Sequence, residues 1–170
     1  AKAISSIINQ VNQPDELVIV DQSPDNESRN IVERLLTNEK QINLNYIHEP
    51  SISGLVEAKQ VGVSKAQGDI ICFLEDDIVL ENDYLYQIEK GFNENTEMLG
   101  CCGVVTNPPI RTCGYNTVFK FFHRGIFEDP RVGLYGNFSG DNHKLILSDV
   151  LSGGLSAWKC EVFKTIQFDV

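Results

Sequence analysis

Two short apolar runs that each end abruptly at carboxylates constrain the fold more than any other feature of the chain. Residues 17–20 read Leu-Val-Ile-Val and are followed at once by Asp21, and residues 70–74 run into an acidic triplet at 75–77. Uninterrupted apolar runs of this length are typical of strands buried on both faces of a parallel sheet. Ligands of such sheets gather outside the carboxyl ends of the strands. The sequence therefore predicts an α/β protein with its site at these strand ends.

Helical periodicity around the two runs completes the pattern. Apolar residues recur at helical spacing in 4–11, 31–36, 55–65 and 85–92, and further short strands are expected at 44–47 and 101–106. Alternating strands and helices predict a Rossmann-like, mostly parallel sheet flanked by helices. Because the chain starts on a helical pattern with no strand before it, we expect the first strand of the sheet to be missing. The chain then reads as a domain trimmed at both ends.

The charge balance limits the classes of ligand. The 170 residues suit a single domain, and 24 acidic against 14 basic residues give a formal net charge of -10. Such a surface is not attracted to a phosphate backbone, so we expect no nucleic-acid partner. An anionic small ligand would need a metal ion or a few local cations. No apolar run approaches the roughly 18 residues of a membrane span.

The cysteines indicate a reducing compartment. There are five, an odd number, and Cys101 and Cys102 are adjacent, a spacing that suits neither a disulfide framework nor a zinc knuckle. We therefore expect reduced thiols and a cytoplasmic location. A single bridge such as Cys102 to Cys113 stays open as an alternative.

The triplet Glu75-Asp76-Asp77 is the candidate metal site. If the extended geometry of the strand continues, side chains 75 and 77 point to the same side. Two neighbouring carboxylates repel each other unless a cation lies between them, and oxygen ligands suit Mg²⁺ or Mn²⁺. The alternative is a solvated acidic loop that caps the next helix.

Three motifs follow one another along the chain. They are Leu-Val-Ile-Val-Asp-Gln-Ser-Pro-Asp at 17–25, Gly-Leu-Val-Glu-Ala-Lys-Gln-Val-Gly at 54–62 and Ala-Gln-Gly-Asp-Ile-Ile-Cys-Phe-Leu-Glu-Asp-Asp at 66–77. In this order they resemble the family 2 glycosyltransferases of the GT-A fold. A Gly-rich segment at 151–158 and Phe168-Asp169 follow where the family has its acceptor segment and a Phe-Asp-Glu sequence. The resemblance covers nearly the whole chain. It implies transfer of a sugar, with inversion, from a UDP- or GDP-linked donor to a carbohydrate or lipid-linked acceptor, in polysaccharide or glycoconjugate synthesis.

The resemblance also assigns the donor side of the site. Asp21 matches the carboxylate that accepts from the nucleobase, and Ser23 lies in the loop beside it. Lys59 stands where the family commonly has Arg, which keeps the charge but loses the planar fork. Glu75 replaces the first Asp of the Asp-x-Asp motif. The resemblance thus implies that the nucleotide is bound by Asp21, Ser23, Lys59 and Asp76. It implies that the metal ion is held by Glu75 and Asp77.

The resemblance divides the chain into a nucleotide-sugar-binding half, 1–106, and an incomplete acceptor half, 107–170. Gly153, Gly154 and Trp158 are expected on the acceptor side, although a Trp in a strand is equally a core residue. Aromatic and basic residues mix in 111–140, which suits a carbohydrate platform or a peripheral contact at the inner face of the membrane. Ordinary core and rim is the alternative for that segment.

Inversion needs a general base, and the resemblance places it beyond Val170, so this segment alone is expected to be inactive. Asp141 and Asp149 are the nearest spare carboxylates, though Asp141 reads better as a turn residue. Two other classes stay open. One is an inactive nucleotide-sugar-binding or interaction module of the same fold, suggested by Glu75, Lys59 and the absent base. The other is a phosphate-binding receiver or metal-dependent phosphatase.

Overall fold

The structure is a computed structural model that describes residues 2–37, 42–106, 145, 147–148 and 151–169. One compact unit comprises Ala1–Cys102 and Gly153–Val170. A second unit, Gly103–Ser152, falls largely outside the described residues. Cys113, Asp141, Asp149 and the aromatic and basic segment 111–140 therefore lie outside the description. The functional division at residue 106 stays a prediction.

Helices and strands alternate over residues 2–102 of the first unit, as the apolar spacing predicted. The helices are α1 (Lys2–Ile8), α2 (Glu27–Leu36), α3 (Leu55–Lys65), α4 (Tyr84–Glu94) and α6 (Val162–Thr165). The strands are β1 (Glu16–Asp21), β2 (Asn43–His48), β3 (Ile70–Leu74), β4 (Gly100–Cys102) and β5 (Leu155–Lys159).

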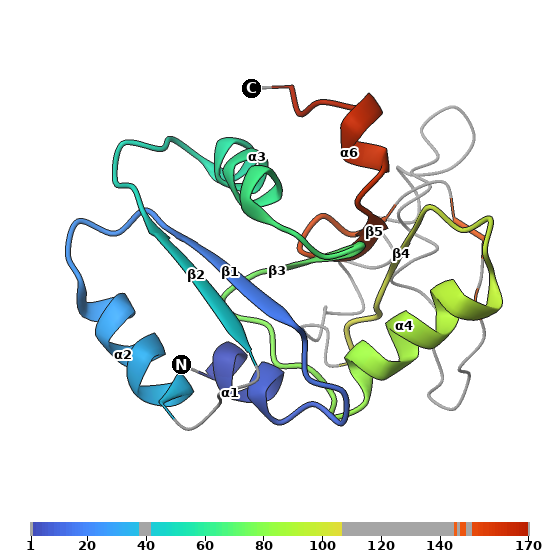
Figure 1. The fold of residues 1–170 in the computed structure, drawn as a ribbon, viewed down its shortest axis with the longest axis horizontal. Helices are drawn as coiled ribbons and strands as arrows, with labels where there is room; N and C mark the ends of the chain where they lie inside the picture. The colour runs from blue at the N-terminus through green and yellow to red at the C-terminus, as the bar shows by residue number, and fades with distance from the viewer. Residues whose placement is uncertain (1, 38–41, 107–144, 146, 149–150, 170) are drawn as a thin grey trace, which may run out of the picture. The chain divides into compact units, whose positions relative to one another are not determined.

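The first sheet is the parallel pair β1 and β2, joined by α2, which is the expected βαβ unit. The register places Asp21 opposite His48, so both strands end at the same edge. In Figure 1, α3 lies on one side of this pair and α1 and α2 lie on the other. Gly62 of α3 approaches Val20 of β1, since a Cβ on the glycine would lie 3.7 Å from Val20 Cγ2. This distance is that of an ordinary van der Waals contact, so α3 packs on β1 at this point.

The second sheet has the order β3-β5-β4, and both of its pairings are antiparallel. The α/β class is confirmed. Among the described strands, the parallel pairing of the expected mostly parallel sheet is found between β1 and β2. The strand expected at 101–106 is also shorter, because β5 offers partners to β4 only at Ser156, Ala157 and Trp158. α4 covers one face of this sheet, where Ile88 and Phe92 pack against Cys101 and Ala157.

A shared apolar cluster connects the two sheets. Buried Ile7, Leu80 and Leu155 pack together, with Leu17 of β1 and Leu74 of β3 against them. Each of the two strands thus has one residue anchored in the same cluster. Leu74 immediately precedes the acidic triplet, so this packing fixes where the triplet leaves the sheet.

A buried glutamine ties α1 to the start of α4. The side-chain amide of Gln10 donates to the carbonyls of Ser6 and Glu81 at 3.0 and 2.7 Å. Its Oε1 accepts the backbone N–H of Leu85 at 2.9 Å, one of the donors that a helix start leaves unpaired. Both the nitrogen and the oxygen of the side-chain amide thus have partners, which explains how an amide is tolerated at 5% exposure.

None of the helices in the described part of the chain has the length and apolar character needed to cross a bilayer.

Candidate functional site

Asp21 is the last residue of β1 and is held by two donors. Its Oδ1 accepts the backbone N–H of Ser23 at 3.0 Å, and its Oδ2 accepts the hydroxyl of Tyr46. Burial raises the pKa of the Asp21 carboxyl, but the hydrogen bonds from Tyr46 and Ser23 outweigh it, so the pKa lies below its ordinary value. The strand therefore ends on an ionised carboxylate with lone pairs left for a further donor.

Tyr46 is a site residue that sequence reasoning missed. Its ring lies under α2, with Arg29 Cζ 5.5 Å from the ring centroid, and Arg29 Nε is 2.9 Å from Glu33 Oε1. Burial raises the pKa of Tyr46, and the hydrogen bond to Asp21 raises it further, so the hydroxyl stays a donor. The available signal was its place in the strand expected at 44–47, but its contact with Asp21 depends on the register between two strands.

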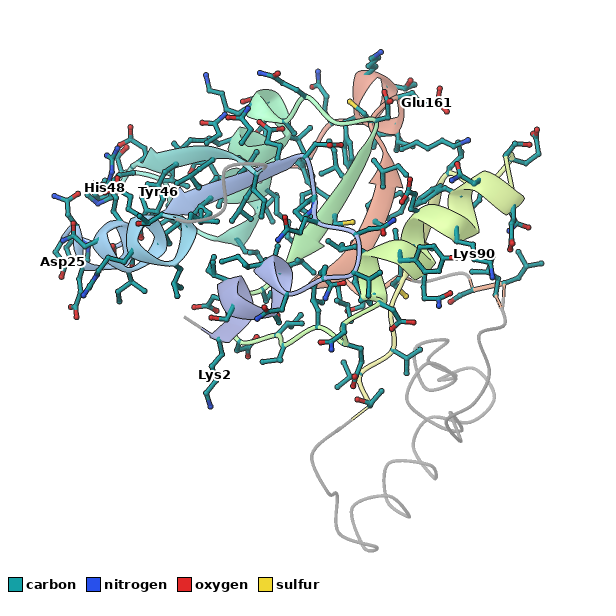
Figure 2. The ribbon with its side chains drawn as sticks, turned by 60° about the horizontal axis from the view of Figure 1, so that its bottom comes forward. Lys2, Asp25, Tyr46, His48, Lys90 and Glu161 are labelled. Carbon is teal, nitrogen blue, oxygen red and sulfur yellow. The ribbon has the colours of Figure 1, made fainter. Side chains whose placement is uncertain are left out.

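The loop after Asp21 is fastened to β2. The carbonyl of Ser23 lies 2.8 Å from Nε2 of His48, and the Ser23 hydroxyl donates to the carbonyl of Asp25 at 3.0 Å. Asp25 Oδ1 in turn accepts the N–H of Glu27 at 3.0 Å, the first residue of α2. Figure 2 shows Asp25, Tyr46 and His48 on the same side of the molecule, beside α2.

Hydrogen bonds also connect this loop to the segment that precedes α3. Gln22 Nε2 donates to the carbonyl of Ile52 at 2.9 Å and to that of Gly54 at 3.3 Å. Gly54 has φ +87, a conformation that costs other residues strain, and the helix begins at the next residue. The glycine of the second motif thus supplies a backbone carbonyl that Gln22, the neighbour of Asp21, contacts.

The acidic triplet forms a turn and does not continue the strand. β3 ends at Leu74, and the N–H of Ile78 donates to the carbonyl of Glu75 at 3.3 Å. Side chains 75 and 77 were expected to face the same side only if the extended strand continued through the triplet. The strand does not continue, so that expectation has no basis in the structure. All three carboxylates are exposed, and within the described residues none has a hydrogen bond or an ion pair.

The triplet still suits a divalent cation chemically. Exposed, unpaired carboxylate oxygens are the donors that Mg²⁺ and Mn²⁺ prefer. Among the described residues, however, no group of three or more His, Cys, Asp or Glu side chains is arranged to hold a metal ion. The carboxylate oxygens are of the chemical type that binds Mg²⁺ or Mn²⁺, but the three carboxylates are not arranged around one point. The metal roles of Glu75 and Asp77 therefore stay predictions.

Gly154 lies directly against Glu75. The N–H of Glu75 donates to the Gly154 carbonyl at 3.1 Å, which extends the pairing of β3 with β5 by one step. A Cβ on Gly154 would lie 2.3 Å from both Cδ and Oε1 of Glu75. The absence of a side chain at 154 is therefore what lets the Glu75 carboxylate occupy its position.

Lys59 of α3 contacts Gly153, the neighbour of Gly154 in the chain. Its Nζ donates to the Gly153 carbonyl at 2.6 Å and lies 5.4 Å from the centroid of the Phe73 ring. These contacts join α3 to the segment that enters β5 and to β3. They use one of the three ammonium hydrogens, and contact between Lys59 and a nucleotide stays a prediction.

Trp158 packs within the second sheet. A Cβ on Gly100 of β4 would lie 2.5 Å from Trp158 Cε3, so the indole covers that glycine. The indole N–H donates to Ser156 Oγ at 3.0 Å. These contacts are those of a structural residue, and a stacking role toward an acceptor sugar stays a prediction.

The described elements form a mixed α/β fold in which two strands end at exposed or partly exposed carboxylates. The model of the family described as glycosyl transferase family 2 matches residues 1–166. The chain belongs to this family, which confirms the resemblance read from its motifs.

Individual relatives agree with this assignment. An uncharacterized glycosyltransferase of Haemophilus influenzae is 33% identical over 92 residues, which cover 54% of this chain and 35% of that protein. The structure of S. aureus TarS 1–349 is similar with a TM-score of 0.61 at 16% identity, covering 96% of this chain and 43% of that chain. TarS 1–349 in complex with UDP gives a TM-score of 0.53 at 12% identity over the same shares. These structures confirm the GT-A fold. This chain spans less than half the length of each.

Proposed function

We propose that this chain binds the donor in a glycosyltransferase that moves a sugar from a nucleoside diphosphate, UDP or GDP, to an acceptor hydroxyl with inversion. The observation that carries the proposal is the ionised Asp21, held at the end of β1 by Tyr46 and Ser23. Membership of family 2 and the existence of a TarS complex with UDP support a nucleotide-sugar donor.

In this proposal Asp21 accepts a ring N–H of the nucleobase. A partly buried carboxylate with a lowered pKa is an acceptor at neutral pH and cannot itself donate. Ser23 contributes its backbone N–H, which donates to Oδ1 of Asp21. The loop around Ser23 is held by two further hydrogen bonds, one between the Ser23 carbonyl and His48 and one from Gln22 to the Ile52 carbonyl. The base-binding edge is thus fixed before the ligand arrives, which limits the ordering cost of binding.

The diphosphate lies toward the acidic turn in this proposal. Glu75 and Asp77 would hold Mg²⁺ or Mn²⁺, and Asp76 would contact the nucleotide. Such an ion, when bound, neutralises the charge that develops on the leaving diphosphate. A chain with a net charge of -10 needs this local cation to hold a dianionic donor.

The acceptor side is assigned to Gly153, Gly154 and Trp158 and to the segment beyond residue 106. The link from Lys59 to the Gly153 carbonyl supports this, since it ties the donor-side helix α3 to the entrance of β5. A carbohydrate or lipid-linked acceptor, a role in polysaccharide or glycoconjugate synthesis and action in the cytoplasm at the membrane face belong to the same proposal. The free thiols of Cys72, Cys101, Cys102 and Cys160 are in keeping with a reducing compartment.

A second candidate is a nucleotide-sugar-binding module without transfer activity. The observation that favours it is the contact of Lys59, whose ammonium already donates to Gly153. The two functions separate in a turnover assay on a chain that extends past Val170, where the resemblance places the general base. The module binds a nucleotide sugar with Mn²⁺ but releases no nucleoside diphosphate, whereas the enzyme releases it when acceptor is supplied.

The experiment that tests the base site substitutes Asp21→Asn and titrates UDP and GDP. The change keeps the shape but removes the charge and presents an amide donor, so the affinity for both should fall at least about tenfold. Asp15→Asn is the matched control, because Asp15 precedes the opposite end of β1. Unchanged affinity in Asp21→Asn would remove the base site from the proposal.

A further inference from the structure

The contact between Tyr46 and Asp21 spans two strands. The register pairs Tyr46 with Ile19, two residues before Asp21, so Tyr46 and Asp21 extend from the same face of the parallel sheet. Tyr46 reaches along this face to donate to Oδ2, while Ser23 donates to Oδ1. Each carboxylate oxygen thus carries one donor supplied by a different part of the fold.

We propose that Tyr46 is a positioning residue that fixes the orientation of the Asp21 carboxylate and thereby sets the base selectivity of the site. The favoured bases are those whose ring nitrogen on the pairing edge carries a hydrogen, uracil and guanine. Cytosine and adenine, whose corresponding ring nitrogen is an acceptor, are disfavoured. This inference rests on the proposed function, and it assigns to Tyr46 a part in recognition that the sequence motifs do not contain.

Tyr46 is itself held in place. The guanidinium of Arg29 lies over the ring at 5.5 Å, and Glu33 fixes Arg29 through the contact of 2.9 Å between Nε and Oε1. The hydroxyl of Tyr46 therefore stays aimed at Asp21 without help from a ligand. Because both donors are fixed, the plane of the carboxylate and the direction of its free lone pairs are fixed as well.

A fixed acceptor discriminates more strongly than a mobile one. Uracil presents an N3–H to the free lone pairs, whereas cytosine presents the N3 lone pair, so two acceptors would face each other. Cytosine could still offer its exocyclic amine, but only to a carboxylate that turns to follow it. With Oδ1 and Oδ2 already engaged, that turn breaks existing hydrogen bonds, and a buried polar group left unpaired weakens binding sharply.

The test measures dissociation constants for UDP and CDP, with Mn²⁺ present, on the wild-type chain and on Tyr46→Phe and Tyr86→Phe. Tyr46→Phe removes only the hydroxyl and keeps the ring under Arg29. We expect it to weaken UDP binding about tenfold and to narrow the preference for UDP over CDP. Tyr86 is 42% exposed on α4, so Tyr86→Phe should change neither quantity.

The ratio of the two affinities is the decisive readout, because a loss of folded protein lowers both affinities equally and leaves the ratio unchanged. An unchanged UDP to CDP ratio in Tyr46→Phe would overturn the inference and leave Tyr46 a structural residue. A wild-type chain that binds UDP but shows no preference over CDP would overturn it too. Failure of the wild-type chain to bind any nucleoside diphosphate would instead remove the proposed function, and the inference with it.

Discussion

Substituting Gly154→Ala separates the role of the acidic turn from the stability of the fold. Gly154 precedes β5, and the Glu75 carboxylate lies over it, 2.3 Å from where an alanine Cβ would be. Non-bonded carbon atoms prefer a separation of about 3.5–4.0 Å, so the carboxylate must withdraw by about 1 Å or more. Gly154 does not have a positive φ, so alanine fits its backbone.

Two effects of different size follow from this displacement. Glu75 is exposed and its carboxylate is the far end of a flexible side chain, so the free energy of unfolding should change by less than about 1 kcal/mol. A metal ligand must lie within about 0.2 Å of its proper distance. If Glu75 binds the ion from its present position, an alanine at 154 therefore removes that ligand. We expect the Mn²⁺-dependent part of UDP affinity to fall about tenfold or more.

The assay is calorimetric titration of UDP at saturating Mn²⁺ and in the presence of a chelator, with a thermal melt of each variant. Gly153→Ala is the control, since among the described residues a Cβ there would meet only Lys59 Nζ, at an ordinary 3.5 Å. Wild-type affinity in Gly154→Ala with Mn²⁺ would refute the assignment of Glu75 as a ligand. An equal loss in Gly153→Ala would show that the effect does not come from Glu75.

Three further predictions concern packing and thiol reactivity. Gly100→Ala should lower the free energy of unfolding by about 1–3 kcal/mol, because its Cβ would lie 2.5 Å from the Trp158 ring. Urea denaturation measures this change, and an unchanged midpoint would contradict the contact. Gly62→Ala should raise the same free energy by about 0.5–1 kcal/mol, because alanine is the better helix former and its Cβ would make an ordinary contact with Val20 at 3.7 Å. A loss of stability would show that α3 lies closer to the sheet. Burial raises the pKa of Cys72 to about 12 and that of Cys101 to about 11, so both stay protonated until the pH is far above the ordinary 9.0. Peptide mapping after alkylation at about pH 8.5 should find these two labelled last, and early labelling of either would contradict their burial.

The parts of the fold that depend on local sequence were predictable. The helix over 55–65 and the strand over 70–74 have the predicted bounds, because Gly54 precedes the helix and Ala66-Gln67-Gly68 separates it from the strand. The order β3-β5-β4 was not predictable in this way, since β5 comes from the distant segment 155–159 and pairs antiparallel with both neighbours. Such pairing is decided by tertiary packing, which periodicity does not contain.

The candidate site likewise has features that local sequence predicts and features that depend on tertiary contacts. Asp21 and the acidic triplet follow apolar runs directly, so their places at strand ends could be read from the sequence. Tyr46 could not, because its contact with Asp21 requires the register between β1 and β2. The contact of Glu75 with Gly154 likewise joins residues far apart in the chain, and the turn at 75–78 replaces the extended geometry that the triplet was assumed to keep.

The most direct test of the account is the binding of UDP to the wild-type chain with and without Mn²⁺, repeated on Asp77→Ala and Asp76→Ala. We predict saturable binding that Mn²⁺ strengthens, loss of the Mn²⁺-dependent part in Asp77→Ala and a smaller loss in Asp76→Ala. Absence of binding by UDP and GDP with or without Mn²⁺ would contradict a nucleoside-diphosphate site in this chain. Binding that ignores Mn²⁺ would contradict the role assigned to the acidic turn.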